Sequence, residues 1–251
     1  MKRLIARLDV KGENLIKGIH MEGLRIIGDP QEYARRYYEQ GADEIVYIDL
    51  VASLYGRSNL KEIVTRACEE VFIPLTVGGG IRSIDDAKAL LESGADKVAI
   101  NTAAVNNPHL LRELSSEFGA QCVVLSIEAR RHSTEKWEVL TECGRQLTGL
   151  DVREWLEVAQ TQGIGEILVT SVDRDGGKAG FDDALIASIC AHSSVPVIAS
   201  GGFGSLHDGC VAFEKGADAI AVGAVLHASD MSVSQIKAHL TTHQYEMRNV
   251  S

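Results

Sequence analysis

Short apolar runs alternate along this chain with longer segments in which apolar and charged residues recur at helical spacing. The helical segments include residues 29–42, 83–95 and 152–164, and each ends near a glycine, which suits a helix C-terminus. The apolar runs predict strands at residues 3–9, 44–50, 74–80, 97–102, 122–128, 166–172, 196–202 and 219–224.

Strands that alternate with helices form parallel sheets, because each helix carries the chain back to the start of the next strand. Eight such units in 251 residues predict an α/β fold of the (β/α)8 TIM-barrel type, with residues 1–251 as a single domain. A doubly wound open sheet is the alternative.

The chain also repeats itself in order. Residues 94–101 match 216–223, residues 74–83 match 196–205 and residues 44–53 match 166–175, each at an offset of 122 (216 − 94, 196 − 74, 166 − 44). The strand that ends at Asp9 answers the strand that ends at Glu128, at an offset of 119 (128 − 9). We therefore expect two similar half-barrels of four units each.

Two acids end equivalent strands of these halves. Active sites of such barrels lie at the C-terminal ends of the strands, so Asp9 and Glu128 are expected to face each other across one mouth. Paired carboxylates suit general acid–base chemistry, because neighbouring groups push their pKa values apart. The alternative is that each caps a helix or pairs with a basic residue.

Glycines follow the third and seventh strands in "VGGG" and "ASGG", and "INTAA" and "VGAVL" follow the fourth and eighth. Glycine lets backbone N–H groups approach an anion, and a following helix adds a favourable dipole. Because both halves carry these turns, we predict two phosphate sites and a ligand with a phosphate at each end. Simple tight turns are the alternative.

Four charged residues begin strands at the other end of the predicted barrel. Side chains alternate along a strand, so Arg3 shares a face with Asp9 but lies about 20 Å below it, at ~3.3 Å per residue. Two bases and two acids can close this floor as a ring of salt bridges, or form a solvated rim. The four are Arg3, Glu44, Lys97 and Glu166.

Composition narrows the class of protein. A net charge of −10 argues against nucleic-acid or anionic-membrane partners. The five cysteines show no C-x-x-C and no cysteine–histidine cluster, so we expect reduced thiols, with no disulfide, metal site or cofactor. Residues 1–10 are too charged for a signal peptide, and no apolar run approaches membrane-spanning length. The expectation is a soluble, cytoplasmic protein.

Several stretches resemble the cyclase subunit of imidazole glycerol phosphate synthase, the HisF family, over essentially the whole chain. They are "LDVK", "KGIHMEGLR", "TVGGGI", "ADKVAINTAAV" and "SVDRDG". The resemblance implies a barrel that docks a glutaminase on its N-terminal face. Ammonia released by that subunit passes the charged ring and reaches the barrel mouth. There the cyclase uses it to convert a ribulosyl bisphosphate substrate to imidazole glycerol phosphate and an aminoimidazole carboxamide ribotide, a step of histidine biosynthesis.

The resemblance also implies roles for individual residues. Asp9 and Glu128 become the catalytic acids, and Lys17 lies in a first loop that closes over substrate. The pocket between the phosphate sites is lined by Asp49, Thr170 and Ser200. One phosphate site comprises Gly80, Asn101 and Thr102, and the other comprises Asp175, Gly176, Gly202, Gly223 and Ala224.

Two departures from the family pattern bear on activity. Glu128 stands where the family has aspartate, and Arg7 stands where it has a small residue. We expect Arg7 to pair with Glu128 or Asp9, to keep Glu128 ionised as a poor general acid, and to crowd the ammonia path. The loops at 52–60 and 174–178 also differ.

These departures leave alternatives to the cyclase. One is a HisF-like paralogue that delivers ammonia with a glutaminase partner for sugar amidation in surface-polysaccharide synthesis. Another is a non-catalytic activator of the glutaminase, which would not need phosphate sites. A third is the related isomerase of histidine synthesis, which lacks the charged floor.

Overall fold

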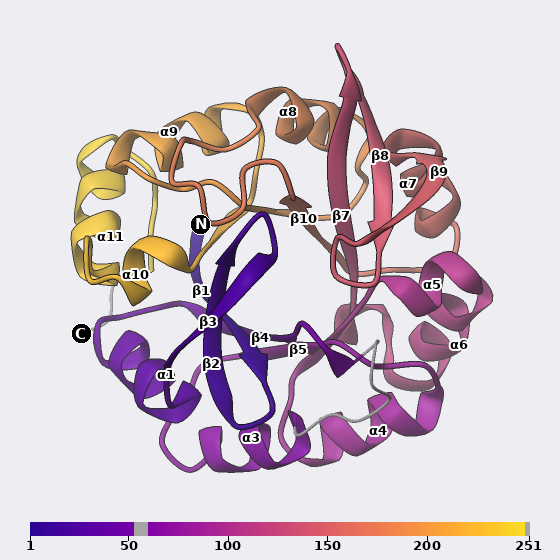
Figure 1. Cartoon of the computed structure of the whole chain (residues 1–251), viewed down its shortest axis with the longest axis horizontal. Helices are drawn as coiled ribbons and strands as arrows, with labels where there is room; N and C mark the ends of the chain where they lie inside the picture. Colours follow the sequence, from indigo (N-terminus) through magenta and orange to yellow (C-terminus); the bar gives the residue numbers. More distant parts are fainter. Residues whose placement is uncertain (53–59, 249–251) are drawn as a thin grey trace.

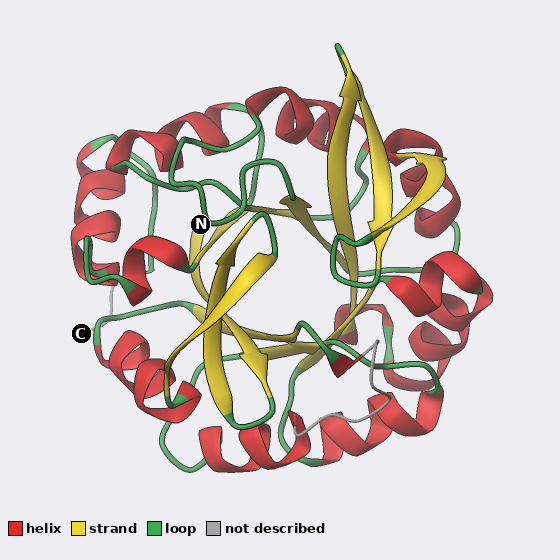
Figure 2. Cartoon of the chain, viewed as in Figure 1, coloured by secondary structure: helices red, strands yellow, loops and turns green. Residues whose placement is uncertain are grey.

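The computed structural model describes residues 1–52 and 60–248 and contains a closed parallel barrel. The strands follow one another in the order β10, β11, β12, β1, β4, β5, β6, β7, and β7 pairs in parallel with β10. That pairing closes the sheet, so the predicted barrel is confirmed and the open-sheet alternative is wrong. Figure 2 shows the strands inside a ring of helices. The barrel strands are β1 (Arg3–Lys11), β4 (Glu44–Asp49), β5 (Leu75–Gly78), β6 (Lys97–Ile100), β7 (Val123–Ser133), β10 (Glu166–Ser171), β11 (Val197–Ser200) and β12 (Ala219–Val222).

Helices surround the barrel as an outer ring (Figure 1). Local signals fix their ends: Asp29 caps α1 through the N–H of Gln31, and Ser83 caps α4 through the N–H of Asp86. The helices are α1 (Pro30–Glu39), α3 (Leu60–Ala67), α4 (Ile84–Glu92), α5 (Thr102–Asn106), α6 (His109–Phe118), α7 (Val152–Gln160), α8 (Asp183–His192), α9 (Leu206–Glu214), α10 (Ala224–His227) and α11 (Val233–Thr242), with a 3-10 turn η1 (Ala120–Cys122). The three helices predicted in detail, α1, α4 and α7, are confirmed.

Alternation along each strand divides the apolar side chains into two cores. Leu4, Ala6 and Leu8 of β1 belong to the large core between strands and helices. Ile5 belongs instead to a small cluster inside the barrel, together with Val46 and Leu168. The face of β1 that carries Ile5 therefore points inward, which brings Arg3, Arg7 and Asp9 into the barrel interior.

Two antiparallel hairpins extend the barrel at matching places in its halves, and the sequence analysis did not predict them. β1 continues into β2 (Asn14–Ile19) and β3 (Glu22–Gly28), and β7 continues into β8 (Lys136–Thr141) and β9 (Gln146–Asp151). The β2–β3 hairpin crosses the centre of the ring in Figure 1. Each half thus opens with a long strand and a hairpin, as expected for a repeat of offset 119–122.

The described residues contain no helix with the length and apolar character needed to span a membrane. The loop at 52–60, whose sequence departs from the family pattern, falls at residues 53–59 outside the described part of the chain.

Candidate active site at the barrel mouth

Asp9 lies at the mouth between two cations. Arg7 Nε donates to Asp9 Oδ1 at 2.8 Å, and Lys17 Nζ donates to Asp9 Oδ2 at 2.7 Å. Lys17 also donates to both carboxylate oxygens of Asp175, at 3.1 Å each. Burial alone would raise the pKa of Asp9, but the charges of Arg7 and Lys17 outweigh it and hold that pKa well below its ordinary value. Asp9 is therefore ionised at neutral pH.

Arg7 connects three strands of the barrel through this network. Its Nη1 donates to Thr170 Oγ1 on β10 at 2.8 Å and to Ser200 Oγ on β11 at 3.0 Å. The residue is only 3% exposed. Burial alone would lower the pKa of Arg7, but the charges of Asp9 and Asp175 outweigh it and raise that pKa. The expected pairing of Arg7 with Asp9 is confirmed.

Glu128 occupies a different environment in the same mouth. The backbone N–H of Gly144 donates to Glu128 Oε2 at 2.7 Å. Burial raises the pKa of Glu128 to about 7, although the Gly144 hydrogen bond and the charge of Arg7 oppose that rise. The expectation that Arg7 keeps Glu128 ionised is wrong, because Arg7 is directed toward Asp9 and desolvation dominates at Glu128. Glu128 can both hold and release a proton near neutral pH.

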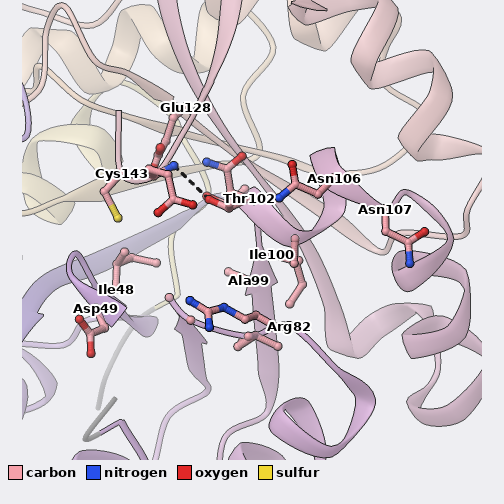
Figure 3. Close-up of a pocket in the computed structure, with 17 residues that line it drawn as sticks. Ile48, Asp49, Arg82, Ala99, Ile100, Thr102, Asn106, Asn107, Glu128 and Cys143 are labelled. Carbon is pink, nitrogen blue, oxygen red and sulfur yellow. Dashed lines mark hydrogen bonds between the residues drawn. The ribbon is translucent and has the colours of Figure 1, made fainter. Parts of the chain in front are cut away.

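A cavity of about 330 Å³ opens beside Glu128, on the side of β4, β5 and β6 (Figure 3). The backbone N–H of Glu142 donates to Thr102 Oγ1 at 3.0 Å, which joins the β8–β9 loop to the start of α5. On the other wall, Asp49 accepts hydrogen bonds from the N–H groups of Val51 and Ala52. The predicted site residues that line this cavity are Asp49, Gly80, Asn101, Thr102 and Glu128.

A second, narrow cavity of about 20 Å³ lies on the side of β10, β11 and β12, with Arg7 in its wall. Gly202 has a φ of +115°, and a Cβ there would meet the carbonyl oxygen of Gly180 at 2.2 Å, so only glycine fits. At Gly176, a Cβ would meet the carbonyl oxygen of Gly18 at 2.2 Å, because the β2–β3 hairpin packs onto this loop. The predicted residues that line this cavity are Lys17, Asp175, Gly176, Ser200, Gly202, Gly223 and Ala224.

The residues of the two predicted phosphate sites thus lie on the two sides of one mouth. Arg7, in the wall of the narrow cavity, hydrogen-bonds to both Asp9 and Thr170. Several lining residues of the larger cavity were not predicted from the sequence, including Arg82, Ser126 and Cys143. Arg82 directly follows the "VGGGI" turn, a signal that could have identified it. Cys143 and Gly144, by contrast, reach Glu128 only through the β8–β9 hairpin, which apolar periodicity does not reveal.

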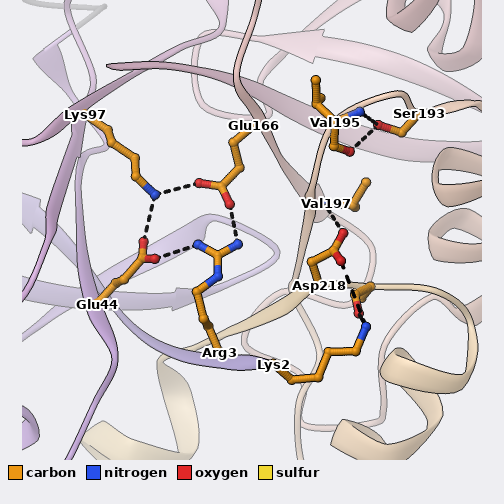
Figure 4. Close-up of polar contacts among 10 residues, drawn as sticks. Lys2, Arg3, Glu44, Lys97, Glu166, Ser193, Val195, Val197 and Asp218 are labelled. Carbon is orange, nitrogen blue, oxygen red and sulfur yellow. Dashed lines mark hydrogen bonds and ion pairs between the residues drawn. The ribbon is translucent and has the colours of Figure 1, made fainter. Parts of the chain in front are cut away.

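At the opposite end of the barrel, the four charged residues form a closed ring, as Figure 4 shows. Arg3 donates to Glu44 at 2.5 Å and also to Glu166. Lys97 donates to the same two acids, at 3.1 Å to Glu44 and 2.8 Å to Glu166. The expected salt-bridge ring is confirmed, and the solvated-rim alternative is wrong. A hollow of about 380 Å³, lined by Arg3, Lys97 and Glu166, opens beside the ring.

Fold and mouth together define a (β/α)8 barrel with a buried pair of acids between two glycine-bounded cavities. The profile of the family described as "Histidine biosynthesis protein" matches residues 3–232. The chain belongs to this histidine biosynthesis family.

Three curated relatives share the name imidazole glycerol phosphate synthase subunit HisF. The chain is 60% identical to the protein of that name from Legionella pneumophila over 206 residues, which cover 82% of this chain and 97% of the relative. It is 46% identical to the one from Mycobacteroides abscessus over 252 residues, 98% of each chain. It is 44% identical to the one from Dictyoglomus thermophilum over 239 residues, 95% of each chain.

Proposed function

We propose that this chain is the cyclase subunit of an imidazole glycerol phosphate synthase. In this role it uses ammonia to convert a ribulosyl bisphosphate to imidazole glycerol phosphate and the aminoimidazole carboxamide ribotide. The observation that carries the proposal is the mouth itself, where two buried acids with different hydrogen-bond partners lie between two cavities suited to anions. The names of the relatives and the family agree with it.

Asp9 and Glu128 divide the acid–base work. Asp9 is ionised and held in place by Arg7 and Lys17, so it orients substrate groups and accepts hydrogen bonds. Glu128, with a pKa raised by burial to about 7, exchanges a proton with the reacting atoms at neutral pH. Ring closure with ammonia and release of the second product both require proton transfers, and Glu128 is the group suited to them.

The two cavities hold the terminal phosphates. In the larger one, Gly80, Asn101 and Thr102 present backbone N–H groups and side chains at strand ends, and Arg82 supplies a positive charge. In the narrower one, Lys17 and the glycines of the β10 to β12 loops play the corresponding part. A substrate phosphate entering that cavity competes with Asp175 for Lys17, so binding rearranges the ion network.

The charged ring supports the second half of the proposal, a glutaminase partner on the N-terminal barrel face. Arg3, Glu44, Lys97 and Glu166 close the floor, and the hollow beside them gives an incoming subunit a place to dock. Ammonia from that subunit enters at the ring and reaches the mouth through the barrel interior, where Ile5 and Leu168 provide an apolar wall. The reaction is expected to run in the cytoplasm.

One observation favours a second candidate, delivery of ammonia to a separate amidotransferase for sugar amidation. Arg7 is buried in the mouth and lines the narrow cavity, where it limits the room for a phosphate. If the Arg7 side chain does not move aside when substrate binds, the barrel still conducts ammonia but does not catalyse closure of the imidazole ring.

Product analysis separates the two candidates. The purified chain is mixed with the ribulosyl bisphosphate and an ammonium salt at high pH, where free ammonia is abundant, and both products are quantified. The cyclase proposal predicts that the two products form in equal amounts without a glutaminase. A folded chain that forms neither product, but stimulates glutaminase activity when that subunit is added, would favour ammonia delivery.

A further inference from the structure

A cluster of three metal-ligand side chains lies on the outer helical layer, away from the mouth. Cys210 is buried on α9, and His239 and His243 lie at the C-terminal end of α11, which packs against α9. One ligand atom from each residue lies within 4.8 Å of the other two. No cysteine–histidine cluster is visible in the sequence, because the three residues are distant along the chain and meet only through helix packing.

The two histidines lie side by side at the end of α11. They are one helical turn apart, so both rings project from the same face of α11, with centroids 4.3 Å apart. His243 Nδ1 lies 2.9 Å from the carbonyl oxygen of His239. A carbonyl oxygen only accepts hydrogen bonds, so Nδ1 carries the proton and Nε2 keeps its lone pair. Such a bond is the usual support of a metal-ligating histidine.

His239 gives an independent argument for a bound ligand. Its Nε2 is buried and finds no hydrogen-bond partner among residues 1–52 and 60–248. A buried polar atom without a partner is costly, and a bound cation would satisfy it.

We propose that Cys210, His239 and His243 bind one divalent ion of the zinc type. One thiolate and two imidazoles are a donor set that suits Zn²⁺, with a fourth position left for water. Bonds of ~2.0–2.3 Å place the ligand atoms of a tetrahedral site about 3.3–3.8 Å apart. The exposed His243 ring needs to move by roughly 1 Å to close the site, a small side-chain rotation.

Binding exchanges one proton for the metal. The Cys210 S–H bond breaks, its proton passes to solvent, and the sulfur electron pair forms the bond to the ion, with no change in oxidation state. The ion then clamps the end of α11 to α9. Since this clamp is on the outer layer, its role is structural rather than catalytic.

Cobalt(II) is the probe of choice, because it occupies zinc sites and absorbs visibly. The full, untagged chain is stripped of metal with a chelator, kept reduced and titrated with Co²⁺. The proposal predicts one equivalent of bound Co²⁺ with a near-ultraviolet thiolate-to-cobalt band, which Zn²⁺ bleaches. It also predicts that Zn²⁺ raises the melting temperature of the parent.

Variants assign the ligands. Cys210→Ser should abolish the thiolate band, and His243→Ala, at an exposed position that does not endanger folding, should weaken Co²⁺ binding by more than about tenfold. His192→Ala is the matched control, because His192 Nδ1 makes the same bond to a carbonyl four residues earlier, that of Ser188, at 2.7 Å. Cys122→Ser controls for the thiol. Absence of the band in the parent, or its persistence in either Cys210→Ser or His243→Ala at full affinity, overturns the proposal.

Discussion

Replacing Arg7 by methionine removes the cation that the mouth is built around and keeps most of its apolar volume. In the parent, Arg7 donates to Asp9 at 2.8 Å, to Thr170 at 2.8 Å and to Ser200 at 3.0 Å, and both Arg7 and Asp9 are almost fully buried. Methionine leaves Asp9 as a buried anion with Lys17, at 2.7 Å, as its remaining cationic partner among the described residues.

The size of the effect follows from this geometry. Breaking a buried ion pair by removing one partner costs about 3–5 kcal/mol, because the remaining charge is uncompensated. Lys17 compensates part of it, so we expect the lower end, about 3 kcal/mol. For a chain of this size, that is a fall in melting temperature of roughly 6–12 °C.

The fall in melting temperature caused by Arg7→Met should depend on pH. The pKa of Asp9 is lowered in the folded state, so its ion pairs stabilise the fold above the ordinary aspartate pKa of about 3.9 and less as the pH drops below it. Thermal unfolding followed by circular dichroism should show a large deficit for Arg7→Met at pH 7 that shrinks toward pH 3.

The double variant Arg7→Met with Asp9→Asn is the control. It removes both charges, so it should be more stable than Arg7→Met alone. Two results would show that the ion network does not hold Asp9 as described. One is that Arg7→Met melts within about 2 °C of the parent at pH 7, and the other is that the double variant melts below Arg7→Met.

Three further changes test other parts of the molecule. Glu128→Gln should stabilise the fold more as the pH rises. The raised pKa of Glu128, about 7, destabilises the folded parent at any pH above the ordinary glutamate pKa, by about 3 kcal/mol at pH 8.5 and little at pH 4. A gain in melting temperature that does not change with pH would contradict this. Arg3→Ala should leave ammonia-driven turnover near the parent rate but lower glutamine-driven turnover when the glutaminase is present. An equal loss of turnover in both assays would argue against entry of ammonia through the charged ring. Gly202→Ala should destabilise by about 1–3 kcal/mol in chemical denaturation and weaken phosphate binding, since its Cβ meets the Gly180 carbonyl; unchanged phosphate affinity would separate this loop from the site.

The barrel and its mouth could be predicted because strong local signals mark them. Each barrel strand is a short apolar run, and Asp9 and Glu128 interrupt two of these runs where each reaches the mouth. The outer strands of the hairpins, β3 and β9, were missed because they are largely exposed and so lack a buried face and an apolar pattern.

The hydrogen-bond partner of a buried side chain is a second feature that the sequence did not determine. Strand alternation placed Arg7 inside the barrel, but its choice of Asp9 over Glu128 depends on Lys17, Thr170 and Ser200, which come from three other strands. The Cys210 cluster escaped notice for a similar reason, since it exists only once α9 and α11 pack together.

The rate of ammonia-driven conversion of the ribulosyl bisphosphate, compared between the parent and Asp9→Asn, tests the central claim most directly. The account predicts a parent that turns over and an Asp9→Asn variant that is folded and slower by about 10²–10⁴-fold, the usual share of a positioned acid–base group. Equal rates for the two proteins would show that the acid pair at this mouth is not the catalytic site.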